Sequence, residues 1–225
     1  MCAERRVVVS WSGGKDAAWA LHELRRDPAV EVVGLLTTVN AQFDRVAMHG
    51  VRIELLRRQA RAAGLPLHEI PLPWPCSNEQ YETALAASIV RIREQWRPTH
   101  VAFGDLFLED VRAYREERMR RTGLEPLFPL WLRPTGELAG SMLEAGVRTR
   151  VVCLDPTRVP RELAGRLLDR SFLDALPPEV DPCGERGEFH TFVTEGPMLQ
   201  GRVAAVPGEI VEREGFVFAD LVPAA

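Results

Sequence analysis

Short apolar segments with the length of buried strands alternate with longer segments of helical periodicity through the first half of the chain. The predicted strands cover residues 6–10, 31–38, 67–72 and 99–103, and the predicted helices cover residues 17–26, 51–63, 77–96 and 109–121. Strands separated by helices of ten or more residues predict a doubly wound parallel α/β sheet. Because ligands of such sheets bind at the carboxyl ends of the strands, the residues directly after each strand are candidates for a site.

The pattern changes after about residue 126, where a proline-rich segment, residues 126–131, predicts an ordered loop. The remaining predicted elements are helices over residues 137–145 and 161–169, a strand over residues 147–154, and short strands at hairpin spacing over residues 203–206, 209–212 and 216–221. We therefore predict two units, residues 1–125 with the parallel sheet and residues 126–225 as a smaller α+β lobe packed on it.

Length, charge and cysteine content limit the classes of protein to consider. A chain of 225 residues with a net charge of −4 has room for a sizeable core and lacks the basic excess of a typical nucleic-acid-binding protein. The chain does not begin like a signal peptide, and no apolar run could span a membrane. Its four cysteines form no Cys-x-x-Cys pair, which disfavours a structural zinc site or a disulfide framework. We expect a cytoplasmic protein, and the sequence leaves a homodimer open.

The segment Ser12-Gly13-Gly14-Lys15-Asp16 lies directly between the first predicted strand and the first predicted helix. Glycines at this place let backbone N–H groups approach an anion, and the helix N-terminus adds partial positive charge. Lys15 would add a full charge, and Asp16 could hold a metal ion that bridges phosphates. Two glycines can also be only a tight turn, and an aspartate only a helix cap. The combination favours a phosphate-binding loop that is neither the Walker type nor the dinucleotide type.

A second segment, residues 181–191, concentrates glycine and charged residues in the smaller unit. Its two glycines indicate a sharply folded loop that core packing does not require. Glu185 and Glu188 could bind a metal, hold a cationic substrate or act as a base, and the other interpretation is a solvated surface turn. His190 alone is more often a structural histidine than a catalyst. Cys183 is more often a small buried thiol than a nucleophile.

Motifs along the chain resemble those of a known family. The loop at residues 12–16 resembles the signature of the PP-loop ATP pyrophosphatases, which implies the adenine-nucleotide alpha-hydrolase-like (HUP-like) fold. Residues 104–112 with Glu116, residues 126–131 and residues 183–191 resemble the diphthine–ammonia ligase family within that group. The matches span residues 5 to 200 in the order of the family, which makes residues 1–125 the PP-loop nucleotide-binding domain and residues 126–225 the substrate-side lobe.

The resemblance implies ATP-dependent formation of an amide. AMP is transferred to a carboxylate oxygen, pyrophosphate leaves, and ammonia then displaces AMP. In the named reaction the carboxylate belongs to diphthine, a modified histidine of an elongation factor. The abundance of alanine and arginine hints at a GC-rich, bacterial genome, for which a metabolite carboxylate would be the substrate. The implied cofactors are ATP and Mg²⁺, with Asp16 as the metal ligand, and free ammonia or a partner supplies the nitrogen.

The resemblance also implies roles for individual residues. The nucleotide-binding residues would be Ser10, Ser12, Gly13, Gly14, Lys15, Asp16, Gly104 and Asp105. The substrate-binding residues would be Arg112, Glu116, Gly184, Glu185, Gly187, Glu188, His190 and Thr191. The catalytic residues would be Lys15, Asp16, Glu185 and Glu188. Arg112 and Glu116 would form a mutual or substrate-facing ion pair, for which an ordinary helix-surface contact is the alternative.

The sequence departs from the family pattern at Ala17, where the pattern usually has serine, and at His190, where eukaryotic-type relatives carry an acidic residue. The first change removes one hydroxyl contact to phosphate, and the second bears on the substrate. A PP-loop sulfur-transfer or RNA-modifying enzyme is an alternative, although it would commonly use paired cysteines and a basic surface. A nucleotide-binding sensor without catalysis is another, although it would not need the loop at Glu185.

Overall fold

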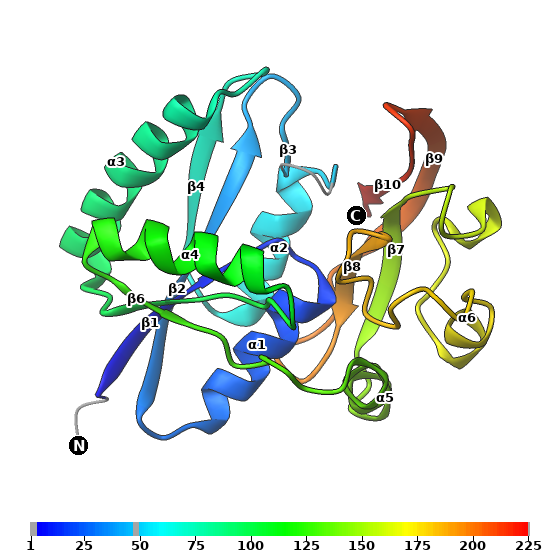
Figure 1. The fold of residues 1–225 in the computed structure, drawn as a ribbon, viewed down its shortest axis with the longest axis horizontal. Helices are drawn as coiled ribbons and strands as arrows, with labels where there is room; N and C mark the ends of the chain where they lie inside the picture. Colours follow the sequence, from blue (N-terminus) through cyan, green and yellow to red (C-terminus); the bar gives the residue numbers. More distant parts are fainter. Residues whose placement is uncertain (1–3, 47–49, 225) are drawn as a thin grey trace.

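A mainly parallel sheet forms the centre of the larger part of the molecule, in a computed structural model that describes residues 4–46 and 50–224 (Figure 1). Its strands are β1 (Arg5–Ser10), β2 (Val30–Asn40), β3 (Arg45–Val46), β4 (Leu67–Leu72), β5 (His100–Ala102) and β6 (Glu125–Leu127). The parallel strands pair in the order β4-β2-β1-β5-β6, and β3 runs antiparallel to the end of β2. Chain order reverses between β1 and β5, which is where open α/β sheets bind ligands.

Helices cover both faces of this sheet, and the alternation of side chains along β1 explains how. They are α1 (Lys15–Arg26), α2 (Ile53–Ala63), α3 (Asn78–Trp96) and α4 (Glu109–Thr122). Successive side chains of a strand point to opposite faces. Val7 and Val9 pack in one core with α1 and α2, and Val8 packs in another with α3 and α4. This arrangement confirms the predicted doubly wound α/β sheet.

An antiparallel sheet forms the smaller part of the molecule. Its strands, in the order β8-β7-β10-β9, are β7 (Arg148–Leu154), β8 (Phe189–Glu195), β9 (Ala205–Arg213) and β10 (Phe216–Pro223), and the nearby helices are α5 (Thr135–Glu144) and α6 (Arg170–Asp174). Figure 1 shows this sheet beside α1 and α2. Phe192 and Val193 of β8 join the core of those helices, whereas Phe189 packs in a separate core with Phe172. The smaller α+β lobe is confirmed, and β8 ties it to the larger part.

Local structure differs from the prediction in the second half of the chain. The prediction of a helix over residues 161–169 is wrong, because only a short 3-10 turn (Arg161–Leu163) lies there before α6. Gly165 has a φ of +75°, which interrupts a helix, and Asp169 caps α6 by accepting the N–H of Phe172 at 2.9 Å. Strand β8 begins inside the segment predicted as a loop, and β9 is one strand where two are predicted.

The structure also bears on membrane-spanning helices and on the boundary between the two predicted units. Within residues 4–46 and 50–224, no helix combines the length and the apolar character that crossing a membrane requires. The predicted boundary between residues 125 and 126 stays a prediction, and it falls within β6. After β6 the chain leaves the parallel sheet and runs to α5.

Candidate active site

The loop after β1 is fixed by hydrogen bonds from β8 and α2. Gly13 has a φ of +79°, which favours glycine, and its carbonyl accepts from the N–H of Val193 and from Nε2 of Gln59, both at 3.0 Å. The N–H of Lys15 donates to Oγ1 of Thr191 at 3.1 Å. Thr191, predicted on the substrate side, therefore holds the first loop in place. Segments far apart in the sequence set the conformation of this loop, as binding loops on a rigid scaffold require.

The same loop leads into the N-terminus of α1. Gly14 is the N-cap of α1 and offers no capping side chain, and its N–H donates to Oγ of Ser12 at 3.2 Å. A helix that begins at glycine lets an anion approach its first backbone N–H groups. This geometry is the one expected of a phosphate-binding loop, and the individual contacts to phosphate stay predictions.

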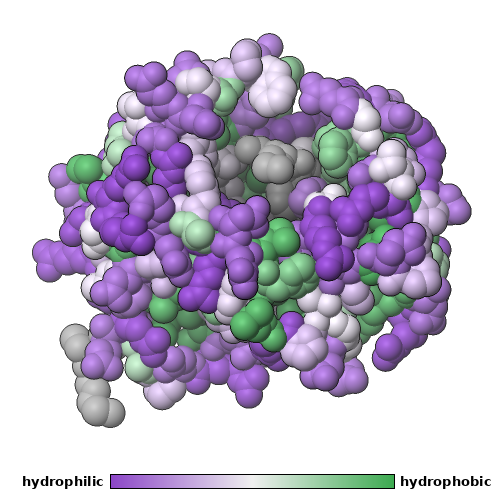
Figure 2. Space-filling view, viewed as in Figure 1, coloured by the Kyte–Doolittle hydropathy of each residue, from purple (hydrophilic) through white to green (hydrophobic). Residues whose placement is uncertain are grey.

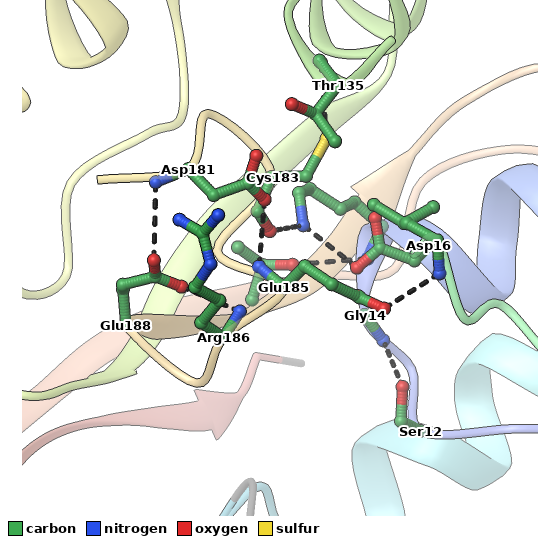
Figure 3. A network of polar contacts seen from close by, with 12 residues as sticks. Ser12, Gly14, Asp16, Thr135, Asp181, Cys183, Glu185, Arg186 and Glu188 are labelled. Atoms are coloured by element: carbon green, nitrogen blue, oxygen red, sulfur yellow. Dashed lines mark hydrogen bonds and ion pairs between the residues drawn. The ribbon is translucent and has the colours of Figure 1, made fainter. Parts of the chain in front are cut away.

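Lys15 is buried between the two predicted site loops. Its side chain is 2% exposed, and its ammonium donates to Oδ2 of Asp16 at 2.8 Å and to the carbonyl of Cys183; Figure 3 labels these two acceptor residues. Burial disfavours the charged amine, but the Asp16 carboxylate and its neighbours raise the pKa of Lys15 above its ordinary value. We predict a phosphate contact for this ammonium. That contact stays a prediction, and in the structure the ammonium links residues 12–16 to residues 181–188.

Glu188 folds its own loop. Its side chain is fully buried, Oε1 lies 3.0 Å from Nη2 of Arg158 and accepts the N–H of Asp181 at 3.3 Å, and Oε2 accepts the N–H of Arg186 at 2.8 Å. Both carboxylate oxygens are therefore used within the protein. This geometry gives Glu188 a structural role, and the catalytic, substrate-side role that we predict for it stays a prediction.

Glu185 is the carboxylate of this loop that contacts the segment after β5. Its Oε1 accepts the N–H of Leu106 at 2.7 Å. Burial raises the pKa of Glu185 to about 7; the Leu106 N–H and the Lys15 charge oppose this rise, and the nearby Asp16 and Asp105 carboxylates add to it. Negative groups from separate segments thus repel one another here. A pKa perturbed by burial and by neighbouring charges makes Glu185 a candidate functional residue.

Gly104 and Asp105 follow β5 and lie against the start of α1. A Cβ on Gly104 would lie 2.8 Å from the carbonyl carbon of Asp16 and 2.9 Å from the nitrogen of Ala17, so only glycine allows this approach. Burial raises the pKa of Asp105, and Arg115 opposes the rise with its Nε 3.5 Å from Oδ2 of Asp105. The ends of β1 and β5 therefore meet, as the parallel topology predicts.

Arg112 and Glu116 form an ion pair across one turn of α4, with Nε 2.7 Å from Oε1, which fits both the mutual pair that we predict and the ordinary helix-surface contact. The Arg112 guanidinium also packs on two aromatic rings, with Cζ 4.9 Å from the ring centre of Phe128 and 4.7 Å from that of Trp131. Residues 126–131 and α4 are therefore joined through one arginine. A contact between this pair and a substrate stays a prediction.

The remaining predicted residues of the second loop are conformational or buried. Gly184 and Gly187 have φ values of +70° and +79°, which give the sharp turns that we predict. His190 lies on β8, where burial and the nearby Lys15 charge lower its pKa to about 4, so its ring is neutral. The Cys183 side chain is 1% exposed, and burial raises its pKa to about 12. This is the buried thiol that we predict, because a nucleophile would need a thiolate.

A cleft of about 510 Å³ opens beside the first loop, between the strand ends and helices α3 and α4. Its lining includes Ser10, Ser12, Thr37, Tyr81, Phe103 and Arg115. Figure 2 shows mostly hydrophilic residues over this face of the molecule, with smaller hydrophobic groups between them. The volume of the cleft is in the range of small-molecule sites.

Sequence reasoning found Ser10 and Ser12 of this cleft but missed its other polar residues, Thr37, Thr38, Tyr81 and Arg115 among them. Thr37 and Thr38 end an otherwise apolar strand, and that change at a carboxyl end was the available signal. Oγ1 of Thr37 is buried and makes no hydrogen bond within the described part of the chain, which favours a polar ligand. Tyr81 and Arg115 lie on helices, where their spacing gave no such signal.

Fold and loop together define the class: an α/β protein of the PP-loop type, with a glycine-rich loop between β1 and α1. Two family models match the chain, the diphthamide synthase N-terminal domain over residues 5–126 and the diphthamide synthase C-terminal domain over residues 135–220. The chain belongs to the diphthamide synthase family.

Relatives along the length of the chain agree with this assignment. The chain is 24% identical over 239 residues to the diphthine–ammonia ligase of Homo sapiens and 24% identical over 242 residues to that of Bos taurus. Each alignment covers 95% of this chain and 88% of the relative. A shorter match to the diphthine–ammonia ligase of Schizosaccharomyces pombe, 27% identical over 116 residues, covers 50% of this chain and 19% of that protein. The predicted resemblance is confirmed, and membership of this family makes the chain an enzyme of the ligase class.

Proposed function

We propose that this chain is an ATP-dependent ligase that adenylates a carboxylate and then transfers ammonia to it, with release of AMP and pyrophosphate. One juxtaposition carries the proposal. The glycine loop at the N-terminus of α1, the cleft of about 510 Å³ and the Asp16, Asp105 and Glu185 carboxylates come together at the ends of β1 and β5. The ligase activity named for the relatives supports the same reaction class.

The nucleotide is proposed to lie with its adenosine in the cleft and its phosphates toward the first loop. The cleft has apolar walls from Ile70 and Leu72 and a hydrogen-bonding group in Thr37, a combination that suits a planar base. Ser10 and Ser12 lie where the cleft reaches the loop. As negative charge develops on the departing pyrophosphate, the N-terminus of α1 would stabilise it.

The acidic residues fit a Mg²⁺ ion that accompanies the nucleotide. Oδ1 of Asp16 is buried and makes no hydrogen bond within the described part of the chain. Among the residues described, no group of three or more Asp, Glu, His or Cys side chains is arranged to hold a metal ion by itself. Protein-bound Mg²⁺ commonly takes one or two carboxylates together with phosphate oxygens, so Asp16, with or without Asp105, is sufficient. When bound, the ion would supply positive charge to the phosphates.

The proposed reaction has two steps, adenylation of the carboxylate and displacement of AMP by ammonia. A carboxylate oxygen bonds to the α-phosphorus of ATP, and the bond from that phosphorus to the pyrophosphate oxygen breaks. The nitrogen of ammonia then bonds to the carboxyl carbon, and the bond from that carbon to the AMP oxygen breaks. One proton leaves the nitrogen. Glu185, with a pKa of about 7, suits both the binding of ammonium and the acceptance of that proton.

The first candidate for the substrate is diphthine on an elongation factor, because the relatives are diphthine–ammonia ligases. A metabolite carboxylate is the alternative for a bacterial chain. The cytoplasmic location and a homodimer stay predictions as well.

Sulfur transfer has less support than ligation. That chemistry commonly uses a pair of reactive thiols, whereas burial raises the pKa of both Cys153 and Cys183 to about 12. Cys76 is partly exposed, and Cys2 lies outside the described residues. A sensor without catalysis would gain nothing from the acidic cluster around Glu185.

The test is a reconstituted assay with the full chain, ATP, Mg²⁺, ammonium and elongation factor 2 that carries diphthine. Chromatography identifies the nucleotide products, and mass spectrometry identifies the amide on the elongation-factor peptide. AMP together with the amide supports the proposal, whereas ADP and phosphate contradict it. Asp16→Asn is the matched variant, because its amide oxygen can still accept from Lys15 while the negative charge is lost. It should fold cooperatively and lack turnover.

A further inference from the structure

Arg115 of α4 lines the cleft, and its Nε makes no hydrogen bond within the described part of the chain. Its Cζ lies 4.9 Å from the ring centre of Phe103, and its Nε lies 3.5 Å from Oδ2 of Asp105. That distance is too long for a hydrogen bond, and both atoms are buried and make none within the described part of the chain. A buried donor and acceptor in this condition are costly, which makes the pair ready to accept a ligand.

Arg118, which lies on the same helix and also lines the cleft, has a different environment. Its guanidinium forms a close ion pair with Glu82 and packs on the ring of Tyr114 at 4.8 Å. Arg115 is therefore the arginine whose Nε edge is unused. The Nε and one Nη of a guanidinium form a fork that matches two oxygens of a phosphate group.

The charge of the cleft favours an anion. Of the described residues that line it, Arg115 and Arg118 are cationic and none is a carboxylate. Ser10 and Ser12 belong to the same lining, but Lys15 and the two loop glycines do not. Under the proposed function, which puts the adenosine in this cleft, Arg115 lies on the adenosine side of the phosphate loop. A nucleotide with its pyrophosphate at the loop and its base near Thr37 has its α-phosphate between these two regions.

We propose that Arg115 binds the α-phosphate of the nucleotide, exchanging its loose ion pair with Asp105 for two charge-assisted hydrogen bonds to phosphate oxygens. The exchange frees Asp105, whose neighbours Asp16 and Glu185 belong to the acidic cluster. Binding of the nucleotide in the cleft thereby removes the positive charge of Arg115 from Asp105, which follows β5. This inference rests on the proposed function, because it takes an adenine nucleotide as the ligand.

The experiment measures binding of AMP and of adenosine by calorimetry, without Mg²⁺, for the full chain and for Arg115→Gln. Hydrogen bonds to a charged group correspond to an expected loss of about 10- to 100-fold in AMP affinity, with adenosine affinity unchanged. Arg115→Lys keeps the charge without the fork and should fall between the two. Arg120→Gln is the control, because Arg120 is on the same helix with its side chain 71% exposed, and it should bind like the wild type.

The possible outcomes separate the role of Arg115 from the proposed function. If the wild type binds AMP and Arg115→Gln binds it equally well, the role of Arg115 is overturned while the proposed function stands. If the wild type binds neither AMP nor adenosine, the proposed function fails. Asp105→Asn provides a test that does not depend on the folding of the arginine variant. It removes the carboxylate that competes for Arg115 and should tighten AMP binding, and weaker AMP binding in a cooperatively folded Asp105→Asn protein would contradict the exchange.

Discussion

Glu185→Gln should stabilise the nucleotide-free protein at pH 8 and at the same time remove most of its activity. The amide keeps an oxygen that can accept the N–H of Leu106, and it loses the charge that Asp16 and Asp105 repel. Burial raises the pKa of Glu185 from an ordinary 4.5 to about 7, so the folded protein resists an ionisation that the unfolded chain allows. The stability contributed by the protonated group is complete below pH 4.5 and is lost as the pH rises through 7.

The size of the effect follows from the same values. A rise from 4.5 to about 7, at about 1.4 kcal/mol for each pH unit, sets an upper limit of about 3 kcal/mol at pH 8. Glu185 is only partly buried, and solvent screens its charge, so we expect about 1 to 2 kcal/mol. For a chain of this length that corresponds to a rise of about 3 to 6 °C in the unfolding temperature.

Thermal and urea unfolding of the wild type and Glu185→Gln, from pH 4.5 to pH 8 and without nucleotide, measure this effect. The difference in unfolding free energy should be small at pH 4.5 and should reach its full size by pH 8. Glu117→Gln is the control, because the Glu117 side chain is 49% exposed, and its difference should not grow with pH. A Glu185→Gln protein that is less stable than the wild type at pH 8, or a difference independent of pH, would refute the reasoning.

Other substitutions test the structural and chemical roles of individual residues. Glu188→Ala should cost about 3 kcal/mol or more in urea unfolding, because Arg158 and backbone N–H groups lose a buried partner, and an unchanged midpoint would argue against this role. Gly104→Ala should cost about 1 to 3 kcal/mol and weaken AMP binding, because the new Cβ would lie 2.8 Å from backbone. Gly136→Ala, whose Cβ meets nothing within 4 Å, should be neutral or stabilising, and equal effects of the two changes would disprove the close approach. Cys183→Ser should keep most of the turnover, and a loss of turnover with intact AMP binding would restore a role for the thiol.

The larger part of the fold could be predicted because its elements are encoded locally. The helix predicted over residues 51–63 is found as α2 (Ile53–Ala63), and Gly64, with a φ of +65°, caps its C-terminus. The valines of β1 are apolar in succession because each face of the strand meets a core. Periodicity and end signals were sufficient for such elements.

The smaller part depends on pairing between distant residues. Strand β8 begins in a segment rich in glycine and charge, and it forms because β7 pairs with it and Phe189 and Phe192 become buried. Pro207 and Gly208 indicate a break, but β10 pairs along both sides of them with an irregularity between Ala219 and Leu221. Signals within a short window do not contain this information.

In the candidate site, too, some features follow from local sequence and others from contacts between distant residues. The loop at residues 12–16 could be found from residue types alone, but the sequence could not separate Glu185 from Glu188. The difference lies in Arg158, which neutralises Glu188, and in Leu106, which orients Glu185. Arg115 likewise gains its significance from Asp105, which lies at the end of another element.

The measurement that tests the central claim most directly follows oxygen from the substrate into the nucleotide product. Elongation factor 2 carrying diphthine with ¹⁸O in its carboxylate is incubated with the full chain, ATP, Mg²⁺ and ammonium, and the products are analysed by mass spectrometry. The proposed mechanism predicts AMP that carries one ¹⁸O atom from the carboxylate, together with unlabelled pyrophosphate. ADP with ¹⁸O in inorganic phosphate would mean that the carboxylate attacks the γ-phosphorus, and it would contradict the account.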